Sequence, residues 1–156
     1  MNLPMKAFCL KGLAEDEKIE IIIEELYGFP TETCYDGGYD FRGVANICVG
    51  KFKVNNAAVF CSTGALYRLL ASLKQCYHTL EGEAKFLHSL ENNITFVLKM
   101  GRFGRAVIEG EYQEFSHLNT RLIFEMETDQ TYILATINEL QHMEDLFGDE
   151  LGKRTE

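Results

Sequence analysis

Residues 93–127 contain three runs in which apolar and polar side chains alternate, and this pattern constrains the fold more than any other feature of the chain. The runs begin at Ile94, Ala106 and Leu122, and the glycine-containing segment Met100–Gly104 separates the first two. Alternation with a period of two is typical of strands that bury one face and expose the other. Because the connections are short, we expect the three strands to pair in sequence order as an antiparallel meander.

The register of this meander follows from the requirement that one face stays apolar. We pair Met100 with Gly104 and Ile108 with Met126, which places Phe96 in the same row as Ile108. The following rows contain Ile94, Gly110 and Phe124, and then Tyr112 and Leu122. All of these rows are expected to face one core.

The same register places four glutamates on the face away from the core. Glu109 lies directly opposite Glu125, and Glu111 and Glu127 lie one row to either side. Like charges directly opposite each other destabilise a sheet, so nearby basic side chains, water or a cationic partner should offset their repulsion. We interpret these four residues as candidates for a partner-binding surface. Metal or acid–base chemistry and an ordinary solvated sheet face are the alternatives.

Isoleucines at positions 19, 21 and 23 alternate with other residues, and the density of β-branched side chains favours a strand there. Ile19, Ile22, Ile23 and Leu26 also fit the spacing of a helix. We expect further strands at residues 41–50, 52–60 and 84–88.

Residues 64–78 and 130–147 carry apolar side chains at helical spacing. Each stretch follows residues that can cap a helix, Ser62 or Thr63 for the first and Thr128 or Asp129 for the second. Strands and helices do not alternate strictly. The sequence therefore predicts an α+β fold, in which two helices pack on one face of a mainly antiparallel sheet.

A length of 156 residues predicts a single domain over residues 1–156. We expect its core at residues 18–148, with residues 1–17 and 149–156 loosely packed. No apolar run approaches the ~18–20 residues that a membrane span requires, and the N-terminus lacks the features of a signal peptide. The five cysteines are odd in number and form no CxxC pair. Reduced thiols in a cytoplasmic protein fit this pattern.

Acidic residues outnumber basic ones, 24 to 15, which gives a formal net charge of −9. Nucleic-acid binding depends on neutralising phosphates with basic side chains, so this composition argues against direct contact with RNA or DNA. It favours a basic protein partner, because complementary fields accelerate association. Solubility alone is the other explanation of the charge.

Residues 31–40 form a glycine-containing segment with tyrosines and acids, which predicts a loop. Tyrosine is enriched in binding surfaces, and loops often carry function. We therefore add Tyr35, Asp36, Tyr39 and Asp40 to the candidate partner-binding residues. An ordinary connection, with Asp-Gly present for turn geometry, is the alternative.

Motifs for catalysis or cofactor binding are not found in the sequence. It contains no GxSxG, HExxH, Walker loop or GxGxxG, and its histidines are isolated from one another. Cys76 and His78 have no partner ligands at zinc-like spacing. We therefore expect no catalytic residues, no metal site and no cofactor.

Three blocks carry a resemblance to a known family: LEGEAKFLHSLENNITFVL (residues 80–98), GRFGRAVIEGEYQEF (101–115) and LIFEMETDQTYILATINELQ (122–141). Over residues 27–148 the chain resembles the WapI-type immunity proteins of bacterial polymorphic toxin systems. The run Thr128–Tyr132 is its most distinctive part. The chain departs from the family pattern in lacking the usual Trp-rich strand and helix, since it has no Trp.

The resemblance implies a cytoplasmic antidote that binds the C-terminal toxin domain of a secreted Rhs or YD-repeat protein by stoichiometric occlusion. Such toxins are often nucleases and commonly basic, so the expected partner is a basic toxin domain. Neither the specific toxin nor any interface residue follows from the resemblance. A non-catalytic interaction or regulatory module, with a housekeeping partner or a small ligand, is the alternative, and an enzyme is the third reading.

Overall fold

The computed structural model describes residues 2–90 and 92–154, which form eight strands and two α-helices. The elements in chain order are β1 (Met5–Lys11), β2 (Lys18–Leu26), β3 (Asp40–Val49), β4 (Phe52–Ser62), α1 (Thr63–Thr79), β5 (Glu83–Phe86), β6 (Ile94–Met100), β7 (Arg105–Tyr112), β8 (Leu122–Asp129) and α2 (Gln130–Phe147). The α+β class predicted from the sequence is confirmed. The two helices begin within one residue of their predicted starts.

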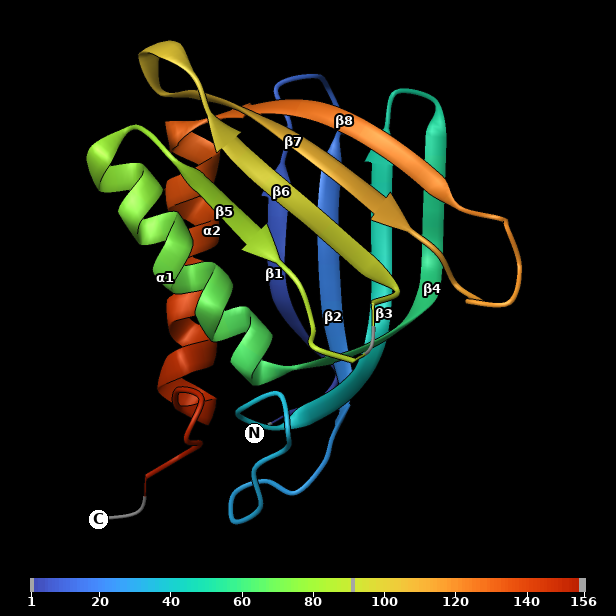
Figure 1. The fold of residues 1–156 in the computed structure, drawn as a ribbon, viewed down its shortest axis with the longest axis vertical. Helices are drawn as coiled ribbons and strands as arrows, with labels where there is room; N and C mark the ends of the chain where they lie inside the picture. The colour runs from blue at the N-terminus through green and yellow to red at the C-terminus, as the bar shows by residue number, and fades with distance from the viewer. Residues whose placement is uncertain (1, 91, 155–156) are drawn as a thin grey trace.

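The strands form two four-stranded antiparallel sheets rather than one. Sheet A has the order β1-β2-β3-β4 and sheet B the order β5-β6-β7-β8, so each sheet is a meander followed by a helix. Figure 1 shows sheet B crossing in front of sheet A, with both helices along one side. The division arises because α1 stands between β4 and β5 and carries the chain from one sheet to the other.

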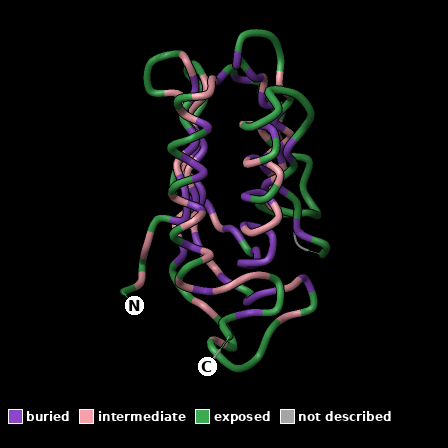
Figure 2. The backbone as a smooth tube through the Cα atoms, turned by 90° about the vertical axis from the view of Figure 1, so that its left-hand side faces the viewer, coloured by how far each residue is buried: buried purple, intermediate pink, exposed green. Residues whose placement is uncertain are grey.

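The core lies between the inner faces of the two sheets. Helix α1 packs beside β5, α2 packs beside β1, and the helices pack against each other, so together they close one side of the space between the sheets. Buried positions recur along both layers, while exposed positions gather at the turns (Figure 2). The outer face of each sheet therefore stays open to solvent.

The expectation that residues 1–17 pack loosely does not hold for β1. Phe8 and Leu10 are fully buried, and the Phe8 ring lies edge-on to Phe86 and Phe96 of sheet B at 5.8 and 6.3 Å between centroids. A register shift between Lys6 and Phe8 breaks the alternation in this strand, which hid it from a search for a period of two.

Residues 149–153 are also held, again unlike the expectation for residues 149–156, of which residues 155–156 lie outside the described residues. Asp149 and Gly152 form a bridge, and the Lys153 amide donates a hydrogen bond to the Tyr39 hydroxyl at 2.7 Å. This contact ties Lys153 to the loop before β3.

The predicted register is correct between β7 and β8 and shifted by two residues between β6 and β7. Ile108 faces Met126 as predicted, but Phe96 faces Gly110 rather than Ile108. The cause is the connection after Met100, where Arg102–Gly104 form a 3-10 turn and Met100 pairs with Ala106. A shift of two residues keeps every side chain on its predicted face.

Both α-helices are capped at their N-termini as the sequence predicts. The Ser62 hydroxyl accepts from the Ala65 amide at 3.0 Å, and the Asp129 carboxylate accepts from the Thr131 and Tyr132 amides at 3.0 and 3.4 Å. These bonds satisfy amide groups that have no partner within a helix.

We expect Asp129→Ala to lower the free energy of unfolding by about 1 kcal/mol, the usual contribution of an N-cap, and the melting temperature by about 3 °C. Thermal unfolding followed by circular dichroism measures the change. Asp129→Ser, which keeps a capping oxygen, should recover most of the loss. Equal melting temperatures for the alanine variant and the wild type would contradict a capping role.

Candidate functional site

The outer face of sheet B carries the four glutamates predicted from the sequence. Glu109 faces Glu125 directly across β7 and β8, and Glu111 and Glu127 occupy the neighbouring outward positions. We call these four residues the acidic face. All four are exposed or half-buried, so the structure brings them together on one accessible surface.

Basic side chains balance only part of the acidic face. Lys99 Nζ lies 3.1 Å from Glu109 Oε2, and Arg121 Nη1 lies 3.2 Å from Glu111 Oε1. The hydrogen bond to Glu109 raises the pKa of Lys99. Within the described part of the chain, Glu125 and Glu127 take part in no ion pair. The face therefore keeps an excess of negative charge.

Sheet A presents a different outer face, on which charges of both signs are paired. Arg42 Nη2 lies 2.9 Å from Glu25 Oε1, and Lys18 Nζ lies 3.7 Å from Glu20 Oε1. Lys6, at the edge of the same sheet, contacts Glu139 of α2 at 3.1 Å. The unbalanced acidic charge of the sheets is thus concentrated on sheet B.

The other four candidates, from the loop before β3 and the first residue of β3, are Tyr35, Asp36, Tyr39 and Asp40. Two of them are exposed and two are buried. Tyr35 is 86 % exposed, and the Asp40 side chain is 53 % exposed. Tyr39 is fully buried, and its hydroxyl donates to the Pro30 carbonyl at 2.8 Å. Asp36 is also buried. Tyr39 and Asp36 therefore hold the fold together and lie away from the accessible surface.

Asp36 is the centre of a buried polar network. Its carboxylate accepts hydrogen bonds from the Ser62 hydroxyl at 2.5 Å, the Arg68 guanidinium at 2.7 Å and the Ser89 amide at 2.9 Å. Burial by itself would raise the pKa of Asp36, but these hydrogen bonds outweigh it and lower the pKa from 3.8 to about 2. The network joins the loop before β3 to α1 and to the segment after β5.

His88 lies against the same network. Its Nδ1 accepts from the Leu90 amide at 3.0 Å, while its Nε2 lies 3.7 Å from Asp36 Oδ2 and 3.6 Å from Asp40 Oδ1. In the sequence this histidine has no candidate partner nearby, because Asp36 and Asp40 lie about 50 residues before it in the chain. The arrangement fixes the segment after β5 beside the loop that carries Tyr35.

The loop reaches α1 through close backbone contacts that explain its paired glycines. The Gly64 amide donates to the Gly37 carbonyl at 3.1 Å, and Gly38 has a positive φ of 64°. A Cβ on Gly38 would lie 2.2 Å from Thr63 Oγ1. Packing against α1 therefore requires glycine at position 38.

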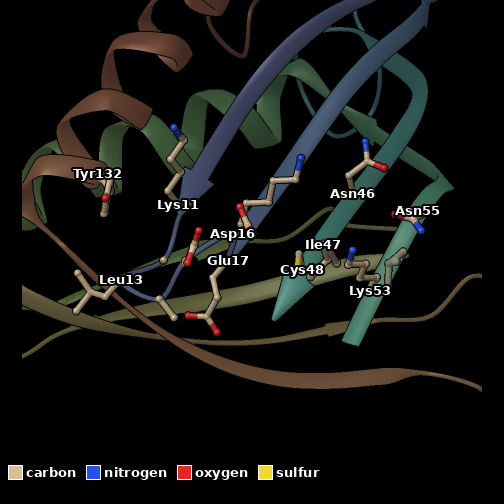
Figure 3. Close-up of a pocket in the computed structure, with 15 residues that line it drawn as sticks. Lys11, Leu13, Asp16, Glu17, Asn46, Ile47, Cys48, Lys53, Asn55 and Tyr132 are labelled. Atoms are coloured by element: carbon tan, nitrogen blue, oxygen red, sulfur yellow. The ribbon is translucent and has the colours of Figure 1, made fainter. Parts of the chain in front are cut away.

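A pocket that was not predicted from the sequence lies at the turn between β1 and β2. This pocket of about 500 Å³ is lined by side chains from that turn, from β3 and β4, and from Tyr132 of α2 (Figure 3). Asp16 and Glu17 line it together with Lys11 and Lys53. Its charges are of both signs, and it does not share the acidic character of sheet B.

The described residues contain no group of three or more His, Cys, Asp or Glu side chains that could hold a metal ion. In the same part of the chain, neither α-helix has the length and apolar character needed to cross a membrane. All five cysteines are free thiols, and two of them, Cys61 and Cys76, are buried.

The chain was compared with protein families, with curated proteins and with solved structures. The model of the WapI-like immunity protein family matches residues 10–148. No match was found among curated proteins. A solved structure described as "Crystal structures of trypanosoma bruciei MRP1/MRP2" aligns with a TM-score of 0.45 and 8 % identity, covering 92 % of this chain and 84 % of that one.

Proposed function

We propose that this chain, which belongs to the WapI-like immunity protein family, neutralises a cognate toxin domain by binding it as a stoichiometric partner and covering its active site. The family match over residues 10–148 is the observation that carries this proposal. In this proposal, the protein acts in the cytoplasm and catalyses no reaction. The toxin domain that it binds is basic, and we propose that it is a nuclease.

The acidic face supports a basic partner. It holds four glutamates on adjacent strands, and among the described residues cations pair with Glu109 and Glu111 but not with Glu125 or Glu127. A nuclease active site and groove must attract phosphates, so they are lined with basic groups. An acidic protein surface competes for the same groups and is steered towards them at high rates. Tyr35 and Asp40 are the accessible residues of the second proposed contact region.

A rescue assay tests this function. The toxin C-terminal domain encoded immediately upstream is expressed with and without this protein in the same cells. We expect growth to be restored by co-expression, and a one-to-one complex to be recovered and measured by size-exclusion chromatography with light scattering. Continued toxicity with both proteins folded and soluble would contradict neutralisation of that toxin.

A further inference from the structure

A groove crosses the outer face of sheet B next to the acidic face. It has a volume of about 400 Å³ and runs across all four strands, from Leu87 beyond β5 to Ile123 on β8. Leu87 is 51 % exposed and Ile123 is 67 % exposed, and Val97 on β6 lines the groove one row away from Ile123. The groove thus offers an apolar floor in the middle of a charged surface.

Carboxylates border this apolar floor at one side. Glu109 and Glu111 line the groove, and Glu125 stands directly opposite Glu109 on the next strand. Lys85 lines the far end of the groove, on β5, with Val97 between it and Glu109. Residues directly opposite on antiparallel strands have Cβ atoms about 5 Å apart, so these two like charges repel each other. Lys99 contacts Glu109, whereas Glu125 forms no ion pair within the described residues. A further cation placed between the two carboxylates would relieve this repulsion.

We propose that the groove receives an arginine side chain of the toxin domain, an inference that rests on the proposed function. The aliphatic part of the arginine packs on Ile123 and Val97, and its guanidinium lies between Glu109 and Glu125. Arginine suits both parts of this site, because its stem is apolar and its planar head binds carboxylates through paired hydrogen bonds. Arginine is also among the residues that most often dominate binding at protein interfaces.

The form of the groove favours a side chain of a protein over a small molecule. Sites for small molecules are concave and bury most of the ligand surface, whereas this groove lies open along a sheet face. A second copy of the same chain would bring its own acidic face against these carboxylates. A basic protein segment is therefore the occupant that charge complementarity selects.

The first test uses the isolated protein and a short peptide. Gly-Gly-Arg-Gly-Gly, acetylated and amidated, is titrated to millimolar concentration while methyl resonances of the protein are followed by NMR. We expect shifts concentrated at Ile123, Val97 and Leu87, and their loss when citrulline replaces arginine. Shifts that are absent, or equal for both peptides, would overturn the proposed arginine site without bearing on neutralisation.

The second test uses the complex recovered from the rescue assay. Ile123→Ser should weaken toxin binding by about 30-fold, as expected for an apolar position at the centre of an interface. Phe52→Ser is the matched control, because Phe52 is 68 % exposed but lies on sheet A, and it should change affinity less than twofold. Both variants should keep the wild-type melting temperature. Equal affinities for Ile123→Ser and wild type, with rescue intact, would refute the groove and leave the proposed function standing.

Discussion

Replacing Glu109 and Glu125 together by lysine should abolish rescue and weaken toxin binding by at least about 100-fold, or about 3 kcal/mol. The substitutions reverse two adjacent charges at the centre of the acidic face, where Lys99 already supplies one positive charge. The new cluster would repel a basic partner. Both positions are exposed, so the variant should fold, and isothermal titration calorimetry of the purified pair measures its affinity.

A matched variant separates the acidic face from net charge. Glu24→Lys together with Asp145→Lys changes the net charge by the same amount, but both positions are exposed away from sheet B, on β2 and in the last turns of α2. We expect this control to bind within about threefold of wild type, because charges beyond a Debye length of about 8 Å are largely screened. Equal losses for the two variants would assign the effect to net charge. Full affinity in the Glu109/Glu125 variant would remove the acidic face from the interface.

The salt dependence of the same pair provides an independent check on charge steering. Association of wild type with the toxin domain should slow by about tenfold between 50 and 500 mM salt, since long-range attraction is screened. The Glu109/Glu125 variant should show a flatter dependence. Stopped-flow fluorescence or biolayer interferometry measures the association rates.

The strand pattern of residues 93–127 was sufficient to place the acidic face. Alternation fixed which side chains point outward, and the pairing of Ile108 with Met126 placed Glu109 opposite Glu125. The error of two residues between β6 and β7 did not matter for this face, because an even shift preserves orientation. Local sequence also sufficed for the helix caps, whose hydrogen bonds span two or three residues.

Contacts between distant segments could not be predicted in the same way. Tyr39 and Tyr35 stand in the same loop and look equivalent in the sequence, yet one is fully buried and the other 86 % exposed. The Tyr39 ring packs edge-on to Phe29 at 5.1 Å between centroids, and its hydroxyl accepts a hydrogen bond from the amide of Lys153, 114 residues away. The packing of α1 against α2 beside the two sheets is likewise a contact between distant segments, which no local pattern reports.

The Asp36 network shows what such distant contacts contribute. The carboxylate binds groups from α1 and from the segment after β5, and its side chain is only 3 % exposed. Arg68, which it holds, also donates to the Leu87 carbonyl at 3.4 Å, and Leu87 lines the groove on sheet B. The network therefore supports one wall of the proposed arginine site as well as the fold.

We expect Asp36→Asn to lower the free energy of unfolding at pH 7 by about 2 to 3 kcal/mol and the melting temperature by about 5 to 10 °C. The amide keeps the shape of the side chain but removes the charge opposite Arg68 and turns an NH₂ group towards a donor. Glu25→Gln is the matched control, because it removes the carboxylate of the exposed Arg42 pair. That pair should contribute little, so the control should melt with the wild type. Equal losses for the two variants would contradict a special role for the buried network.

The pH dependence of this difference identifies the carboxylate as its source. The pKa of Asp36 is about 2 in the folded protein and near 3.8 when unfolded, so its ionised form stabilises the fold at every pH well above 4. As the pH falls from about 4 to about 2, the unfolded state and then the folded state bind the proton, and the contribution is lost. The stability gap between wild type and Asp36→Asn, measured by urea unfolding, should therefore be constant from pH 7 to pH 5 and narrow below pH 4. A gap that stays the same down to pH 2.5 would mean that the variant loses packing or hydrogen bonds rather than a buried charge.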